Sequence, residues 1–268
     1  MVNILVSVNP DLASSIAIRY AGQLAHFMEI ALQPIHVKEP EQKGSLFGTG
    51  WVRHTWEHAL AEKGEEEINL LIRTEKPYCP ALAAPRVVVG ERENEILKEL
   101  QTGAYDLFME GVLASFDEGD FKKLITSKLY QSAPCPAIVV KNLVPLEKVA
   151  LLSYVGLEPS KLVDDVSDIL RQAKFPLDVI HLVPKKDKKD LEVNEEAHEA
   201  QGFDNLVDAI RKKGLDLQKG QVLTGHPKDI ADYLSRYGLV VCAVSNVLDK
   251  KSPIHTVLAF TPSPIFIC

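Results

Sequence analysis

Residues 105–141 read YDLFMEGVLASFDEGDFKKLITSKLYQSAPCPAIVVK, and this stretch decides the predicted fold. It has the pattern of a strand, a loop, a helix, a proline-flanked turn and a second strand. A similar stretch, YGLVVCAVSNVLDKKSPIHTVLAFTPSPIFIC, returns at residues 237–268. Each stretch ends in a short apolar run behind P-x-P, which is PCPAIVV in the first and PSPIFIC in the second. The chain is therefore predicted to hold two copies of one unit.

Composition limits the functional classes that fit this chain. It has 268 residues, 46% of them hydrophobic and 25% charged, with a formal net charge of −7. The acidic balance argues against a nucleic-acid partner, because phosphate binding needs a basic face. No apolar run approaches the ~20 residues of a membrane span, and the start, MVNILVSVNP, lacks the basic region of a signal peptide. We expect a cytoplasmic protein with no membrane partner.

Strand-like and helix-like patterns alternate through the first half, which predicts a doubly wound parallel sheet. The predicted strands are 3–8, 30–37, 87–90, 105–112 and 135–140. Four helices are predicted. The first begins after Asp11, which is its expected N-cap, and the others cover 51–74, 91–102 and 120–132. Gly103 is predicted to end the third helix as a C′ glycine.

The second half repeats this order after a linker at 143–148. Its predicted strands are 149–155, 178–182, 221–224 and the two in 237–268, and its predicted helices are 159–174, 192–213 and 227–237. The halves can be overlaid, because ILVSVN (4–9) matches ALLSYV (150–155) and PIHV (34–37) matches VIHL (179–182). Sheets commonly meet at edge strands, so strands 135–140 and 263–268 are the predicted contact between the copies.

Several of these segments resemble the universal stress protein family. The similarity rests on ILVSV near the start, IHV on the second strand, YDL followed by Gly111, and APCPAIVV near the end of the first half. It extends over the whole chain as a tandem pair and is weaker in the second half. The resemblance implies two doubly wound five-stranded sheets of flavodoxin-like order 3-2-1-4-5, related by a pseudo-two-fold axis, in units 1–143 and 148–268. It also implies self-association through last strands, or a protein partner.

Many members of that family bind ATP through a loop of the form G-x-x-G, nine residues, then G-S or G-T. Gly111 matches the first glycine, Ala114 stands where the second belongs, and Lys123 with Leu124 replaces the G-S pair. Ile125 and Thr126 follow, and Asn9 stands where the family has an aspartate after the first strand. In the second half, Lys251-Ser252 and Val155 hold the equivalent places.

These departures leave two functional hypotheses. Glycines let backbone N–H groups approach a phosphate, so Lys123 is expected to block the cradle or to replace it as a point charge. The first hypothesis is a stress-response binding or regulatory module with a reduced or lost ATP site and no catalytic residue. The second is a stress protein that still holds ATP, or another anionic small molecule, in the first half and acts as a slow ATPase or a nucleotide switch. The site remnant is Asn9, Val37, Gly111, Ala114, Lys123, Ile125 and Thr126.

Other candidate sites follow from the histidines and cysteines. His54 and His58 form H-x-x-E-H, the inverted zincin pattern, so a zinc hydrolase is a remote alternative. Structural roles are expected for His36 and His181, which occupy equivalent strand ends. The four cysteines form no C-x-x-C motif, and no Ser-His-Asp set is visible. We therefore expect a non-enzymatic protein that contains no metal.

Overall fold

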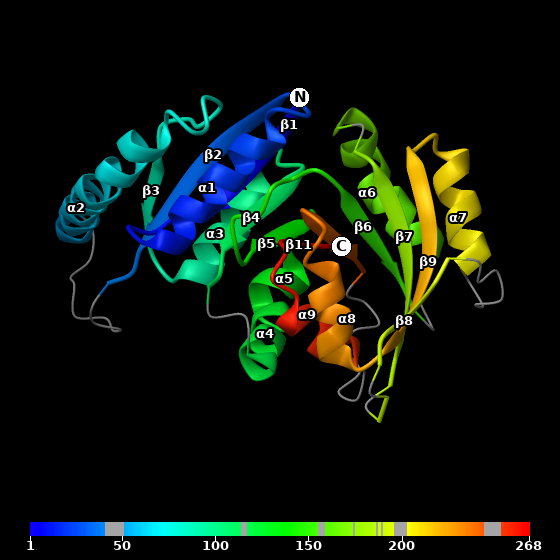
Figure 1. The fold of residues 1–268 in the computed structure, drawn as a ribbon. Helices are drawn as coiled ribbons and strands as arrows, with labels where there is room; N and C mark the ends of the chain where they lie inside the picture. The colour runs from blue at the N-terminus through cyan, green and yellow to red at the C-terminus, as the bar shows by residue number, and fades with distance from the viewer. Residues whose placement is uncertain are drawn as a thin grey trace.

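A computed structural model describes residues 1–40, 51–113, 117–154, 159–173, 175–185, 187–188, 190–195, 203–243 and 253–268 (Figure 1). Its helices are α1 Leu12–Leu24, α2 Trp51–Glu75, α3 Arg92–Thr102, α4 Glu118–Ile125, α5 Lys128–Ser132, α6 Pro159–Ala173, α7 Phe203–Lys212, α8 Pro227–Leu234 and α9 Ile254–Phe260. Its strands are β1 Val2–Ser7, β2 Ile30–Lys38, β3 Arg86–Val89, β4 Leu107–Gly111, β5 Ala137–Val140, β6 Val149–Ser153, β7 Leu177–Pro184, β8 Glu192–Asn194, β9 Leu217–Gly225, β10 Leu239–Cys242 and β11 Ile265–Ile267.

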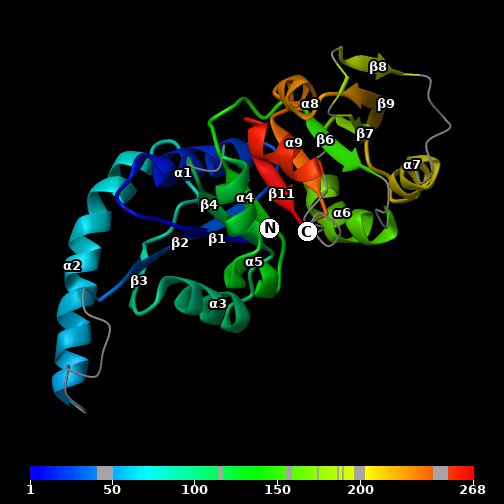
Figure 2. The same ribbon diagram turned by 90° about the horizontal axis from the view of Figure 1, so that it is seen from below.

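The strands form one continuous sheet with helices on both faces (Figures 1 and 2). Its order is β3-β2-β1-β4-β5-β11-β10-β6-β7-β9-β8. The first five strands confirm the predicted order 3-2-1-4-5. The second half has the same order when it is read in the opposite direction, as β9-β7-β6-β10-β11. Alternate side chains of β1 point to opposite faces of the sheet, since Ile4 and Val6 pack in one buried cluster and Leu5 packs in another. Such two-sided burial is typical of parallel strands.

The two halves meet through their last strands, as predicted. β5 and β11 pair antiparallel, with Ile138 opposite Phe266. These two residues hold the same place behind P-x-P, so the pairing has the symmetry expected of two copies related by a two-fold axis. β5 also pairs with β4, and β11 with β10, so neither last strand has a free edge. A second chain would have to associate through another surface.

Three predicted elements differ in the structure. The segment 120–132 forms two helices, because the backbone leaves helical geometry at Thr126, whose hydroxyl bonds to the carbonyl of Lys122. The segment 192–213 begins with β8, which pairs antiparallel with β9, and its described helical part is α7, Phe203–Lys212. The second half therefore has a sixth strand, which the apolar pattern did not indicate because every residue of β8 is exposed.

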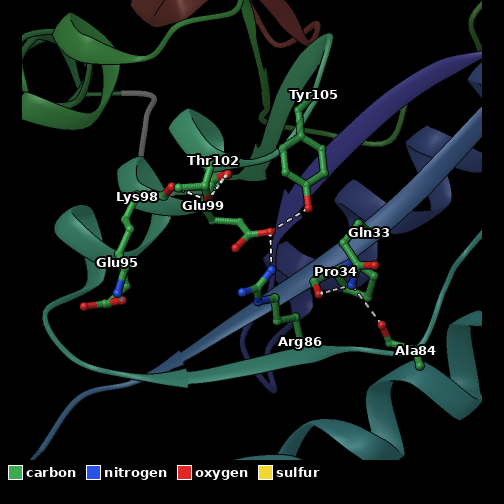
Figure 3. Close-up of polar contacts among 9 residues, drawn as sticks. All are labelled: Gln33, Pro34, Ala84, Arg86, Glu95, Lys98, Glu99, Thr102 and Tyr105. Carbon is green, nitrogen blue, oxygen red and sulfur yellow. Dashed lines mark hydrogen bonds and ion pairs between the residues drawn. The ribbon is translucent and has the colours of Figure 1, made fainter.

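Gly103 ends α3 for a different reason from the one predicted. Its φ of −89° is not left-handed, so it is not a C′ glycine of the predicted kind. A Cβ there would lie 2.2 Å from the ring of Tyr105, whose hydroxyl donates to Oε1 of the buried Glu99. Arg86 donates to the same oxygen, over 2.7 Å, as Figure 3 shows. The glycine therefore makes room for a ring that fixes the end of α3 against β3.

No helix in the described part of the chain is long and apolar enough to cross a membrane. The longest, α2, carries charged residues through its middle and runs beyond the β3 edge of the sheet (Figure 2).

Candidate functional site

The sheet order reverses between β1 and β4, and the carboxyl ends of these strands form the edge where α/β proteins place ligands. Asn9 follows β1, Val37 lies near the end of β2 and Gly111 ends β4. The structure therefore brings these three predicted site residues to one edge. Ala114 lies outside the described residues.

A network of polar side chains fills this edge. Arg92, at the start of α3, forms an ion pair with Glu110 of β4, whose side chain is only 5% exposed. The other oxygen of Glu110 accepts a 2.6 Å hydrogen bond from the hydroxyl of Tyr130 on α5. Arg92 also donates from Nη2 to Ser7 Oγ of β1 over 2.9 Å. Four elements are thus tied together where the strand order reverses.

The pKa values of Tyr130 and Arg92 are shifted by this buried, charged environment. Burial, followed by the negative charge of Glu110, raises the pKa of Tyr130 well above its usual value, so the phenol remains a hydrogen-bond donor. Burial opposes the charge on Arg92, but Glu110 outweighs it and the pKa of Arg92 is raised. The guanidinium of Arg92 therefore keeps its charge beside the carboxyl group of Glu110.

Gly111 serves helix packing in this structure. A Cβ on Gly111 would lie 1.9 Å from the carbonyl oxygen of Ala13, in the first turn of α1. The backbone N–H of Asn9 donates to Ser14 Oγ over 2.7 Å, and Ser14 N–H donates to the N-cap carboxylate of Asp11 over 2.8 Å. The turn between β1 and α1 is thus closed by its own side chains.

The remaining predicted site residues lie on or beside α4, and two of them turn away from the edge. Ile125 is fully buried in a cluster that also contains Phe121 and residues of α9. The hydroxyl of Thr126 bonds to a helix carbonyl. Lys123 is 81% exposed and pairs with Asp120 at 3.0 Å, which raises the pKa of the lysine. Of these three, only Lys123 faces the pocket that adjoins the network.

That pocket has a volume of about 270 Å³ and lies between α3, β4, α4 and α5. Its lining is Arg92, Glu93, Glu110, Val112, Asp120, Lys123, Leu124, Ser127, Leu129 and Tyr130. Three of these side chains are acidic and two are basic, so the lining carries a formal charge of 2 − 3 = −1.

The equivalent edge of the second half has a different arrangement. Ser153 Oγ lies 3.0 Å from His181 Nδ1, and both side chains are buried. Burial lowers the pKa of His181, so the ring is neutral near pH 7. His36 is also buried, with Nδ1 2.9 Å from the carbonyl of Val8. Both histidines make bonds expected of structural residues. Val155 and Lys251-Ser252 lie outside the described part.

The zinc alternative gains no support from the described residues. His58 Nδ1 lies 3.5 Å from Glu62, and both side chains are 66% exposed on α2. The side chain of His54 is outside the described part. Among the described side chains, no group of three histidine, cysteine or acidic residues could hold a metal ion.

Sequence reasoning missed the network of Ser7, Arg92, Glu110 and Tyr130. One signal was present, because Glu110 interrupts the apolar strand LFMEG at a position that faces the interior. A glutamate is almost never fully buried unless it is paired. Its partners were not predictable, since Arg92 and Tyr130 come from separate helices.

Comparisons with known proteins agree with this architecture. No protein-family model and no curated protein sequence matches the chain. A universal stress protein from Archaeoglobus fulgidus is 14% identical, with 99% of this chain and 95% of that chain covered and a TM-score of 0.65. A Pseudomonas aeruginosa protein assigned to the same family is 17% identical, with 99% and 92% covered and a TM-score of 0.53.

A shorter match is an Arabidopsis thaliana universal stress protein family member with AMP bound. It is 13% identical, covers 52% of this chain and 90% of that chain, and has a TM-score of 0.35. The two matches over the full length establish the fold class. This chain has the universal stress protein fold, in a form where two copies follow each other in one polypeptide.

Proposed function

We propose that this protein is a binding or regulatory module of the universal stress protein type, in which the nucleotide site of the first half is reduced or lost. The proposal takes residues 1–143 and 148–268 as the two units. It includes a cytoplasmic location, a role in the stress response and no catalytic turnover.

The observation that carries this proposal is the Arg92–Glu110 pair at the reversal of strand order. A polyphosphate at this edge would have to approach the buried carboxylate of Glu110 or separate it from Arg92. Glu110 is buried but Arg92 is 33% exposed, so separating them costs less than the about 3–5 kcal/mol that is typical of a fully buried pair. Nucleotide binding at this edge would have to offset that cost.

The packing of Gly111 and Ile125 supports the same proposal. Gly111 is needed where α1 meets β4, so its presence does not require a phosphate. Ile125 is buried against α9 and is not free to contact a ligand. The lysine at the G-S position, Lys123, is a solvated residue paired with Asp120, which favours the interpretation as a helix-surface lysine.

The alternative is a protein that binds ATP in its first half through the edge residues Asn9, Val37 and Gly111, with Ile125 and Thr126. The two hypotheses separate in a calorimetric titration of the intact chain with ATP and Mg²⁺. We expect no saturable heat up to about 1 mM nucleotide, which corresponds to less than about 4 kcal/mol of binding free energy. Mass spectrometry is expected to detect no nucleotide released when the purified protein is denatured. Saturable micromolar binding, or co-purified nucleotide, would contradict the proposal.

A further inference from the structure

We infer that the pocket beside the Arg92–Glu110 pair binds a small aliphatic zwitterion, of the kind represented by an α-amino acid with an apolar side chain. This inference rests on the proposed function, because it assumes that the edge does not take a polyphosphate. It assigns a ligand class to the pocket from the groups that line it.

Arg92 supplies the carboxylate-binding group. A guanidinium has five N–H groups in a planar fork. Both hydrogens of Nη2 are used, one by Ser7 and one by Glu110. The three N–H groups on Nε and Nη1 meet no acceptor among the residues that the structure describes, and the side chain is 33% exposed and lines the pocket. Because Nη2 belongs to both two-donor edges of the guanidinium, each edge keeps one remaining donor, so Nε–H or Nη1–H can give a ligand carboxylate one charge-assisted hydrogen bond.

The acidic side chains supply the group that recognises an amine. Glu110 forms its ion pair with Arg92, and among the described residues Asp120 forms its ion pair with the exposed Lys123. An exposed pair of this kind contributes little energy, so Asp120 can exchange its partner for a ligand ammonium at small cost. Glu93 adds a further negative charge to the lining. The formal charge of −1 disfavours phosphate groups and is compatible with a ligand that carries one charge of each sign.

Aliphatic side chains fix the remaining part of the ligand. Val112, Leu124 and Leu129 contribute to the lining, and Leu129 is almost completely buried. The volume of about 270 Å³ lies just below the range of about 300–1,000 Å³ that is typical for drug-sized ligands. A short branched hydrocarbon with an ammonium and a carboxylate at one end fits these three conditions together.

The test compares leucine with two analogues that each lack one charged group. The analogues are 4-methylpentanoate, which has no amine, and 3-methylbutylamine, which has no carboxylate. Thermal shift and calorimetry are measured on the intact chain at pH 7, with ATP and Mg²⁺ as a fourth ligand. We expect leucine to bind saturably and each analogue to bind at least about 10-fold more weakly, the effect of about one lost charge-assisted contact.

Two variants check the assignment of the groups. Asp120→Asn is expected to weaken leucine about 5-fold or more and to leave 4-methylpentanoate unchanged, because only the amine loses a partner. The matched control is Asp168→Asn, since Asp168 is 83% exposed on α6 and forms the same i,i+3 pair, with Arg171. Arg92→Lys keeps the charge but removes the Nε–H and Nη1–H donors, so it is expected to weaken the binding of leucine and of 4-methylpentanoate alike.

Different outcomes of these titrations would contradict the inferred ligand class and the proposed function. If leucine, isoleucine, valine and methionine all fail to stabilise the protein at about 10 mM, and ATP also fails, the ligand class is wrong while the reduced nucleotide site stands. The class is also wrong if either analogue binds as well as leucine. Saturable ATP binding overturns both conclusions.

Discussion

Gly111 illustrates how one residue type can carry two different meanings. In the sequence it matches the first glycine of a phosphate-binding loop, whereas in the structure its missing side chain lets α1 approach β4. These roles predict different consequences of adding a methyl group. A residue needed for ligand approach loses binding when it is changed, and a residue needed for packing loses stability.

Gly111→Ala is therefore expected to destabilise the fold by about 2–4 kcal/mol, because the added Cβ would lie 1.9 Å from a backbone carbonyl that cannot move alone. Urea unfolding followed by circular dichroism measures this free energy. Gly119→Ala is the control, since its nearest neighbour is the flexible side chain of Asp117 at 3.0 Å and it lies in the exposed first turn of α4. The control is expected to change stability by less than about 1 kcal/mol. Equal effects of the two substitutions would contradict the packing role.

For single residues, the sequence predicted where a side chain lies in the fold better than it predicted which residues that side chain contacts. Asn9, Val37 and Gly111 do reach the same sheet edge, because parallel strands bring their carboxyl ends together whatever their side chains are. Ile125 and Thr126 do not reach it, because the i,i+4 spacing of Phe121 and Ile125 directs one face of α4 into the core instead. The glycine pattern of the loop does not show that this face of α4 is buried, because the burial comes from packing against α9.

Among the secondary-structure elements, α9 depends on a lysine from the other half of the chain. Lys141 follows β5 and is only 1% exposed. Its ammonium donates to the carbonyls of Leu258, Ala259 and Thr261, at 2.9, 2.6 and 2.9 Å. These carbonyls lie at the C-terminus of α9, where the helix dipole favours a positive charge. The cap therefore couples the end of β5 to the helix that precedes β11.

Lys141→Met is expected to cost about 2–4 kcal/mol at pH 7, because it removes all three donors and leaves buried carbonyls without them. Chemical unfolding measures the loss. Lys123→Met is the matched control, because Lys123 is 81% exposed and its ion pair with Asp120 is solvated, so no measurable change in stability is expected. A loss no larger than that of the control would show that the cap does not stabilise the contact.

The stability that Lys141 contributes is expected to change with pH in a defined direction. Burial lowers the pKa of Lys141 to about 7, below the value of about 10.4 for an unfolded chain. Between these values the unfolded chain binds a proton that the folded chain has released, so the stability due to Lys141 rises with pH. The difference between wild type and Lys141→Met is therefore expected to widen by about 2 kcal/mol from pH 7 to pH 9. An unchanged difference would mean that the three carbonyls keep the ammonium charged.

Elements with strong apolar patterns were predictable, and elements defined by tertiary pairing were not. The strand after each P-x-P was located correctly, since AIVV and IFI are uninterrupted apolar runs. β8 has no buried residue, so its strand conformation comes from hydrogen bonds to β9 and not from its own side chains. This difference explains why the second half was predicted with five strands and shows six in its described residues.

For the whole molecule, the antiparallel pair β5 and β11 makes the two halves one sheet. Tyr20 of α1 adds a buried hydrogen bond of 2.8 Å to the carbonyl of Gly238. The largest buried cluster includes Ile4 and Tyr20 from the first half and Leu206 from α7 in the second. Because sheet and core are both continuous, the halves are expected to unfold together although the chain repeats one unit.

Both tryptophans, Trp51 and Trp56, lie in the first half, so their fluorescence reports on that half while far-ultraviolet circular dichroism reports on the whole chain. Leu206→Ala removes a fully buried side chain in the second half and is expected to cost about 2–5 kcal/mol. If the halves unfold together, the fluorescence and dichroism midpoints in urea coincide in the wild type and fall by the same amount in the variant. Val193→Ala, at a position 42% exposed on β8, is the control and is expected to leave both midpoints in place. A fluorescence midpoint that does not move in Leu206→Ala would show that the repeated units unfold separately and that the shared sheet does not couple them.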